Sequence, residues 1–507
     1  MAFRQLSESG DHTGNAGLLE QINKDNPMKP SEYTGLDGIA LADLVKRGEV
    51  TAAELADTAR AAIDEVNPRL NGVIGMIDAV AEEALARGPK DGPFSGVPFL
   101  IKDIGMHYAN IPHEMGSRIA KGFMFPHDTE LAIRFKRSGL ITLARTNTPE
   151  FGCNASTEPV ANGPSRNPWN PAHSSGGSSG GSAASVAAGV VPFAHGNDGG
   201  GSIRIPASCC GLVGLKPSRG RMPSGPDSDD LIFGMGAELV LSRTVRDTAA
   251  VLDATHGPDV GARIMLPSPP APYRQLMERP PARLRIAYAL TTPDGALPMH
   301  PDCQAGVERT AKLLADLGHI VEEASPRFDH AAASQNFLDL AASYFGGGIG
   351  IIQQLTGRVP SRENLEATTL AVYEYGRQFS AFGLGAAFAR INELSRLMGA
   401  FFTTYDLWLT PTLAVPPVKL GVMDAMADMS AVAWMRTIFD RAPFTAPFNA
   451  TGQPAISLPL HQSADGLPIG MHFVGRLGDE ATLLQLARQL EQAAPWLGRR
   501  PGIFFGT

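Results

Sequence analysis

Short apolar runs alternate with helical segments along this chain, and this alternation limits the folds that it can adopt. The run GVPFLIKDIG, from residue 96, is bounded by glycines and is typical of a buried strand that ends at Lys102. The helical pattern DTELAIRFKRSG follows it, and LITLARTNTPEFG then has the pattern of a second buried strand. This order of strand, helix and strand predicts an α/β fold, in which helices cover the faces of a sheet.

The composition is that of a large folded protein. The chain has 507 residues, of which 43% are hydrophobic and 19% charged, so it can bury an extensive core. Its net charge of −8 and the lack of a long Lys/Arg run argue against nucleic-acid binding. The N-terminus lacks the pattern of a secretory signal, and the soft stretch 183–194 is too short to span a bilayer. We therefore expect a cytoplasmic protein without a membrane anchor.

Cysteine and histidine usage suggests neither disulfides nor a metal centre. Cys153, Cys209, Cys210 and Cys303 are few for this length, and we expect them to be buried thiols in a reducing compartment. The sequence contains no CxxC or HExxH motif, and its twelve histidines do not cluster along the chain. We therefore expect no metal site.

The helical patterns suggest a lead-in, a main domain and a lobe. Residues 39–66 have apolar residues at helical spacing, with a capping box from Thr51 to Glu54 between two helices. We assign 1–70 to an N-terminal helical lead-in and 71–507 to the main domain. About 262–443 begins with a proline-rich stretch and continues in long helical patterns, which predict a helical lobe inserted over the sheet.

Two clusters of glycine and serine are the strongest candidates for a site. They are HSSGGSSGGSAAS, from residue 173, and GNDGGGSIRIPASCC, from residue 196. Such tracts are usually flexible linkers, but these lie between predicted core elements, where a linker would interrupt a sheet. Glycines there let the backbone approach a ligand closely. Gly199, Gly200 and Gly201 could direct N–H groups into one concavity, as a developing oxyanion requires, with Ser202 beside them.

A serine nucleophile needs a base, and the sequence leaves two possibilities open. The first cluster contains a G-x-S-x-G match centred on Ser178, which would suit an α/β-hydrolase with a Ser-His-Asp triad. Neither a compelling histidine nor an HGGG oxyanion motif accompanies it. The other possible base is Lys102, because an amine at the end of an apolar run can lose its charge through desolvation.

Taken together, the motifs resemble those of the amidase signature family. They are GVPFLIKD, both glycine-serine clusters, TNTPEFG, NPWNP and LTPTLAVPP, and they extend from about Ile39 to the C-terminal helix. The resemblance implies a central mixed, twisted sheet covered by helices on both faces, with a helical lobe. The form DGGGSIRIPASCCGL is most similar to the branch that contains 6-aminohexanoate-cyclic-dimer hydrolases.

The resemblance also implies a role for each site residue, within a Ser-cisSer-Lys triad. Ser202 would be the nucleophile, Ser178 the bridging serine after a cis peptide bond, and Lys102 the base. The remaining assignments are the oxyanion donors Gly199, Gly200 and Gly201, with the Ser202 N–H also possible, and the loop-supporting residues Gly177, Ser179, Asp198 and Arg204. No cofactor and no metal are implied. The loop has a third glycine that departs from the commonest pattern of the family, because Gly199 stands where many members have Thr or Ile.

The function expected from this resemblance is hydrolysis of a small linear or cyclic amide, such as an aminohexanoate oligomer, through an acyl-serine. Alternatives are an amidotransferase A-type subunit of a tRNA-dependent complex, an aryl-acylamide or carbamate hydrolase, and a non-catalytic binding protein. We expect a small-molecule amide as partner, no nucleic acid, no membrane, and a possible homodimer. SYFGGGIGIIQQL, from Ser343, suggests either an acyl pocket or a loop that ends a helix.

Overall fold

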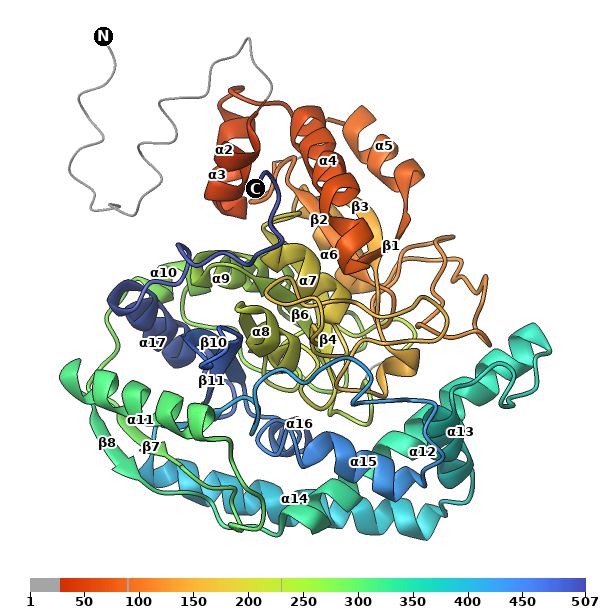
Figure 1. Cartoon of the computed structure of the whole chain (residues 1–507), viewed down its shortest axis with the longest axis vertical. Coiled ribbons are helices and arrows are strands. Elements are labelled where there is room, and N and C mark those ends of the chain that lie inside the picture. Colours follow the sequence, from red (N-terminus) through yellow and green to blue (C-terminus); the bar gives the residue numbers. More distant parts are fainter. Residues whose placement is uncertain (1–27, 89–90, 229) are drawn as a thin grey trace.

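The structure is a computed structural model that describes residues 28–88, 91–228 and 230–507. Residues 1–27 lie outside the described residues. They include the N-terminal stretch in which we found no pattern of a secretory signal, and the start of the predicted lead-in. Helices surround the strands in Figure 1, with α2 to α5 gathered at one end of the molecule and α12 to α15 at the other.

The described part of the lead-in consists of helices that pack on the main body. They are α2 (Pro30–Gly35), α3 (Gly38–Lys46) and α4 (Ala52–Leu70). The capping box is present, because the Glu54 N–H donates to Thr51 Oγ1 and the Thr51 N–H donates to Glu54 Oε2. Apolar side chains of α4, among them Leu55 and Val66, belong to the same core as the strands. The boundary at residue 70 stays a prediction.

A three-stranded sheet holds the first predicted site residue. It consists of β1 (Val73–Met76), β3 (Ile141–Thr146) and β2 (Pro98–Lys102), in that order, with β2 parallel to β3 and β1 antiparallel to it. Between β1 and β2 lies α5 (Asp78–Ala86), and α6 (Glu130–Arg137) connects β2 to β3. The predicted strand, helix and strand are all confirmed, and β2 ends at Lys102 as expected.

The larger sheet has eight strands and mixed directions, which confirms the mixed α/β architecture. In spatial order they are β4 (Phe193–Asp198), β6 (Ala237–Ser242), β5 (Val213–Lys216), β10 (Ala455–Gln462), β11 (Pro468–Val474), β9 (Leu407–Pro411), β7 (Arg285–Tyr288) and β8 (Ile320–Glu323). Neighbours are antiparallel from β4 to β9 and parallel from β9 to β8. The helices packed around these strands include α7 (Gly180–Ala187), α8 (Arg204–Cys210), α9 (Val245–Thr255), α10 (Tyr273–Met277), α11 (Pro301–Asp316), α16 (Pro447–Thr451) and α17 (Glu480–Ala493).

The strands form two sheets rather than the one central sheet that we expected. The break lies between β2 and β4, which run beside each other without a backbone ladder. At this break the Lys102 N–H donates to the ring nitrogen Nδ1 of His195, at 3.3 Å. A side chain thus takes a hydrogen bond that a continuous sheet would give to a carbonyl group.

The region 262–443 contains the predicted helices but is not purely helical. Its long helices are α12 (His330–Thr356), α13 (Ala367–Arg377), α14 (Ala381–Thr404) and α15 (Ala431–Phe439), which share a hydrophobic core of their own. The same region also supplies β7, β8 and β9, because short runs such as RLRIAY and YDLWLTP place Ile286 and Leu407 in the main core. The glycine-rich segment from Ser343 lies within α12, so the interpretation as a helix-ending loop is wrong.

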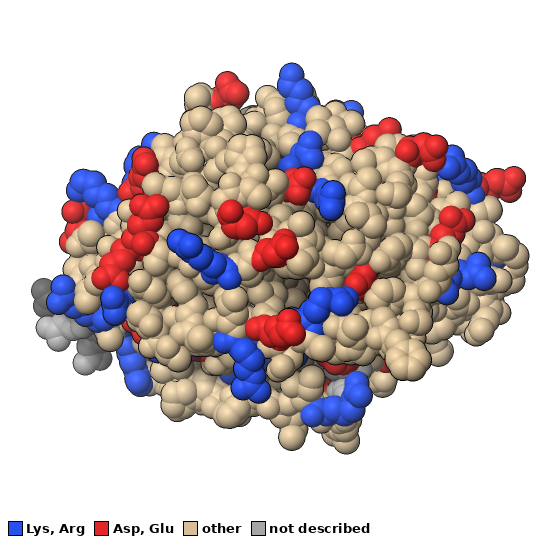
Figure 2. Space-filling view, turned by 90° about the horizontal axis from the view of Figure 1, so that it is seen from below, with Lys and Arg blue, Asp and Glu red and all other residues tan. Residues whose placement is uncertain are grey.

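Several expectations about the surface and the cysteines can also be compared with the structure. All four cysteines are buried free thiols, as expected. Among the described residues, no helix has both the length and the apolar character needed to cross a bilayer. Figure 2 shows basic and acidic side chains interspersed on the face seen from below, so this face carries no continuous basic stripe.

Candidate active site

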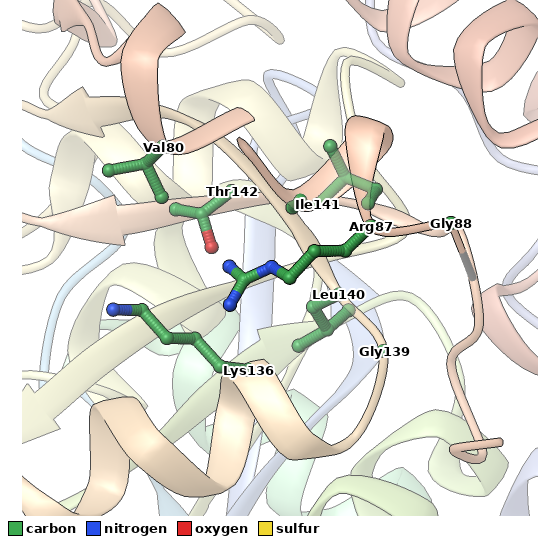
Figure 3. Close-up of a pocket in the computed structure, with 9 residues that line it drawn as sticks. Val80, Arg87, Gly88, Lys136, Gly139, Leu140, Ile141 and Thr142 are labelled. Carbon is green, nitrogen blue, oxygen red and sulfur yellow. The ribbon is translucent and has the colours of Figure 1, made fainter. Parts of the chain in front are cut away.

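The two glycine-serine clusters meet at the wall of one cavity, which has a volume of about 490 Å³. Gly177 and Ser178 from the first cluster, and Gly199, Gly200 and Ser202 from the second, line its wall. This volume lies within the range of small-molecule sites. By contrast, the pocket shown in Figure 3, between α5, α6 and β3, is lined by Arg87 and Lys136 and measures about 20 Å³, which is room for little more than a water.

Lys102 is completely buried at the end of β2, and its amine contacts both clusters. Its Nζ lies 2.6 Å from Ser178 Oγ and 2.6 Å from Asn197 Oδ1. Burial lowers the pKa of Lys102 to about 7, although the negative charges of Asp198 and Glu238 act in the opposite direction. The amine can therefore be uncharged near neutral pH, which is the form that accepts a proton.

Ser178 faces this amine from a tightly packed turn. The peptide bond between Gly177 and Ser178 is cis. A Cβ on Gly177 would come within 2.7 Å of the Asn154 carbonyl oxygen, so only glycine fits there. Next in the chain, Ser179 donates its N–H to the Ser202 carbonyl and its hydroxyl to the Asn197 carbonyl, both at 3.3 Å. Ser179 therefore ties the first cluster to the second.

Asp198 and Arg204 form a buried ion pair within the second cluster. The Arg204 guanidinium donates to both carboxylate oxygens of Asp198, at 2.9 Å each, and both side chains are fully buried. Burial alone would raise the pKa of Asp198, but Arg204 and then Asn449 outweigh it and hold the pKa well below its usual range. Arg204 also donates to the Thr445 carbonyl, at 3.0 Å, and this contact fixes the loop against the chain after α15.

One of the three predicted oxyanion donors is already engaged. The Gly201 N–H donates to Asp198 Oδ1 at 2.7 Å, with Gly201 at a φ of +134°. The N–H is thus used to shape the loop, and Gly201 does not line the cavity. Gly199, Gly200 and Ser202 do line it, which narrows the candidate oxyanion donors to their three amides.

Sequence reasoning missed three polar residues of this site. Asn197 contacts the Lys102 amine, Thr445 donates its hydroxyl to the Gly200 carbonyl at 2.7 Å, and Asn449 donates to Asp198 Oδ1 at 2.9 Å. Asn197 lies within the quoted motif, but nothing in the motif indicates where its side chain points. Thr445 and Asn449 lie more than 240 residues from the loop that they support, so no local pattern could have found them.

The far wall of the cavity comes from the helical lobe. Tyr344, Phe345, Gly348, Ile351 and Ile352, all on α12, line it. They belong to the segment for which an acyl pocket was one interpretation, and their position supports that interpretation. The cavity wall is mostly apolar, and it includes no Lys or Arg side chain among the described residues.

The comparisons with known proteins agree with this geometry. The model of the Amidase family matches residues 54–484. The chain belongs to this family. The chain is 38% identical over 486 residues to a 6-aminohexanoate-cyclic-dimer hydrolase of Paenarthrobacter ureafaciens, which covers 92% of this chain and 96% of the relative. A putative amidase AmiC of Mycobacterium bovis is 40% identical over 471 residues, covering 91% and 95%.

The solved structures point to the same family. A structure of 6-aminohexanoate cyclic dimer hydrolase complexed with substrate superimposes with a TM-score of 0.86 at 35% identity, covering 92% of this chain and 99% of that one. The amidase signature fold and the resemblance to this branch of the family are confirmed. The protein is a hydrolase that acts on carbon–nitrogen bonds of amides.

Proposed function

We propose that the protein hydrolyses a small uncharged amide through a Ser-cisSer-Lys relay and an acyl-serine intermediate. The observation that carries the proposal is the 2.6 Å contact between the buried Lys102 amine and Ser178 Oγ, in the wall of a cavity that Ser202 also lines. Two serines that line one cavity, with a neutral amine behind one of them, supply the groups that a proton relay to an attacking oxygen requires.

In the first step neutral Lys102 takes the hydroxyl proton of Ser178, while Ser178 takes that of Ser202. The Ser202 oxygen attacks the amide carbonyl carbon, and the carbonyl electron pair moves onto its oxygen. Amides of Gly199 and Gly200, with that of Ser202, would stabilise this negative charge; removing one such donor typically costs about 2.7–4 kcal/mol of transition-state stabilisation.

The second half of the reaction returns the protons. The tetrahedral intermediate collapses as its carbon–nitrogen bond breaks, and the relay delivers a proton from Lys102 to the leaving amine. This leaves the acyl group on Ser202. Water then attacks the acyl carbon with the same relay as base, which releases a carboxylic acid and restores the Ser202 hydroxyl.

The cavity wall supports a preference for uncharged amides. Without Lys or Arg side chains among its described residues, it offers no strong partner to a carboxylate, and desolvating an unpaired carboxylate is costly. A cyclic aminohexanoate dimer has no charged end, whereas a linear aminohexanoate oligomer ends in a carboxylate. A similar protein whose structure was solved with substrate is a 6-aminohexanoate cyclic dimer hydrolase. We therefore propose cyclic aminohexanoate amides as the first substrates to test, with aryl acylamides and carbamates next.

The decisive experiment is labelling with a fluorophosphonate, followed by intact mass and peptide mapping. We expect one adduct on Ser202 in the wild type and none in Ser202→Ala. An adduct on Ser178 instead, or no adduct at all, would contradict the proposal.

The amidotransferase alternative is tested separately, because it predicts glutamine hydrolysis only when partner subunits are added. The homodimer and the absence of nucleic-acid binding stay predictions, to be measured by light scattering and by a shift assay with tRNA.

A further inference from the structure

Three side chains outside the relay converge at the wall of the same cavity. His107 lies in the segment after β2, His127 precedes α6, and Asp227 follows the cis bond between Gly225 and Pro226. His107 Nε2 lies 3.3 Å from one Asp227 carboxylate oxygen, and His127 Nε2 lies 2.9 Å from both oxygens. One potential ligand atom from each lies within 4.8 Å of the other two, and no other such group occurs among the described residues.

The orientation of His107 leaves one ring nitrogen without a partner. Its Nδ1 lies 3.4 Å from the Gly105 carbonyl oxygen, so the ring hydrogen on Nδ1 is directed to that acceptor. Nε2 then carries a lone pair, is buried, and forms no hydrogen bond. The side chain is only 4% exposed. The Phe125 ring stacks on it at 3.8 Å and restricts its rotation.

This arrangement places two acceptors face to face. The Nε2 lone pair of His107 and the carboxylate of Asp227 are 3.3 Å apart, and neither supplies a hydrogen for the other. Buried polar atoms without partners are uncommon in folded proteins. A cation between the two would give His107 Nε2 a partner and would also bind the carboxylate. The bond from the other ring nitrogen to a carbonyl group is also the support that metal-binding histidines usually have.

We propose that His107, His127 and Asp227 form a binding site for a divalent transition-metal ion of the zinc class. Two imidazoles and one carboxylate are a common donor set for zinc, with the fourth position left to water. With bonds of roughly 2.0–2.1 Å, tetrahedral geometry places neighbouring ligand atoms roughly 3.3 Å apart. The His107–Asp227 distance already has this value, and the His127–Asp227 distance is 0.4 Å shorter.

The site is open to solvent on one side and to the cavity on the other. The side chains of His127 and Asp227 are 40% and 36% exposed, so an ion can enter from the surface. His107 and Asp227 also line the cavity that contains Ser178 and Ser202. The proposal does not depend on the catalytic relay, because metal binding is measured without turnover.

The test is a titration of the full-length chain, free of any affinity tag and stripped with a chelator, with zinc chloride in a calorimeter. The ligand variant is His127→Asn, whose exposed side chain can be replaced without disturbing the core. The matched control is His300→Asn, because His300 is similarly exposed and caps α11 with its side chain, a role that asparagine also fills. Cobalt chloride serves as a second probe, because its visible absorption reports the coordination geometry.

We expect one zinc ion per chain in the wild type and in His300→Asn, with at least tenfold weaker binding in His127→Asn. In the wild type, cobalt should give the intense visible bands of a tetrahedral site. Added zinc should remove these bands by displacing the cobalt. Should the wild type show no saturable binding, or should His127→Asn bind as tightly as the wild type, the proposal is wrong. Loss of binding in His300→Asn would also overturn it, because the ion would then be elsewhere. Asp227→Asn gives an independent check, with the same tenfold weakening expected.

Discussion

Asn197 Oδ1 lies 2.6 Å from Lys102 Nζ, on a side chain whose orientation is fixed. The Asn197 amide nitrogen donates to the Ile104 carbonyl at 2.9 Å, so its oxygen must be the atom that faces the lysine. An uncharged amine has two N–H donors and one lone pair. With one N–H directed to Asn197, the lone pair is free to face Ser178 Oγ. Asn197 is thus a positioning residue for the proposed base.

The activity of the wild type should rise with pH through about 7. Burial lowers the pKa of Lys102 to about 7, and only the neutral amine accepts the Ser178 proton. Below pH 7 the logarithm of kcat/KM should fall by about one for each pH unit, and above pH 8 it should be level. The measurement is kcat/KM on an uncharged amide between pH 5 and 9. A profile that stays flat over this range would argue against a lysine base.

Substitutions of Asn197 should move this pH profile in opposite directions. Asn197→Asp puts a negative charge 2.6 Å from the amine, which raises the pKa of Lys102 and shifts the acid limb to higher pH. Asn197→Leu removes the oxygen that accepts a hydrogen bond from the amine. Because this acceptor favours the charged amine, its loss lowers the pKa of Lys102 and shifts the acid limb to lower pH. The value of kcat also falls, because the lysine is less well oriented. A merely structural role would lower activity in both variants without moving the limbs apart.

Lys102 and Ser178 should act as a unit. Lys102→Ala and Ser178→Ala are each expected to lower kcat by roughly three or more orders of magnitude, because each breaks the same proton relay. The double variant should then be little slower than the slower single variant. The measurement is kcat for the four proteins on one substrate, with circular dichroism to verify folding. A double variant slowed by the product of the two single effects would show that the two side chains act independently.

Local sequence patterns predicted the elements that carry the site, and they did so for physical reasons. A run of apolar residues ending in Lys102 indicates a buried strand, and β2 ends at that residue. The capping box at Thr51 is a contact within one helical turn, so the sequence alone reveals it. By contrast, β7 and β9 come from short apolar runs within a region dominated by long helical patterns, so we predicted a helical lobe there and not these strands.

Contacts between distant segments could not be predicted in the same way. The amine of Lys102 and the amide of Asn197 are 95 residues apart in the chain and meet because β2 and β4 lie side by side. The Gly201 amide was a reasonable oxyanion donor from its place in the motif, but its direction depends on the Asp198 carboxylate. Tertiary packing sets the direction of a side chain or an N–H, so the motif alone does not predict it.

Arg204→Met should destabilise the fold strongly. It would leave the Asp198 carboxylate buried without its cation, and breaking such a pair typically costs about 3–5 kcal/mol. Because Arg204 holds the pKa of Asp198 below its ordinary value, the stabilisation from this pair is present above about pH 4 and is lost as pH falls further. Urea unfolding of wild type and variant at several pH values measures this. A stability difference under 1 kcal/mol at pH 7 would contradict it.

Two neighbouring glycines of α12 allow a controlled test of the cavity wall. Gly348 lines the cavity whereas Gly347 does not, and a Cβ at either position would meet no atom within 4 Å. Leucine is favoured over glycine inside a helix by up to about 1 kcal/mol, so Gly348→Leu and Gly347→Leu should both be at least as stable as the wild type. The two variants therefore differ mainly in how much room they leave for a substrate.

Gly348→Leu should lower kcat/KM for a cyclic or aryl amide by about tenfold or more while changing that for a small aliphatic amide much less. Crowding of an apolar pocket by a few methylene groups is worth roughly 1–3 kcal/mol in discrimination, and a small substrate leaves space for the added side chain. Gly347→Leu should match the wild type on both substrates. Equal losses on the two substrates, or the same loss in both variants, would mean that α12 does not border the bound acyl group. The discriminating quantity is the ratio of kcat/KM for the two amides, which cancels any difference in the fraction of active enzyme.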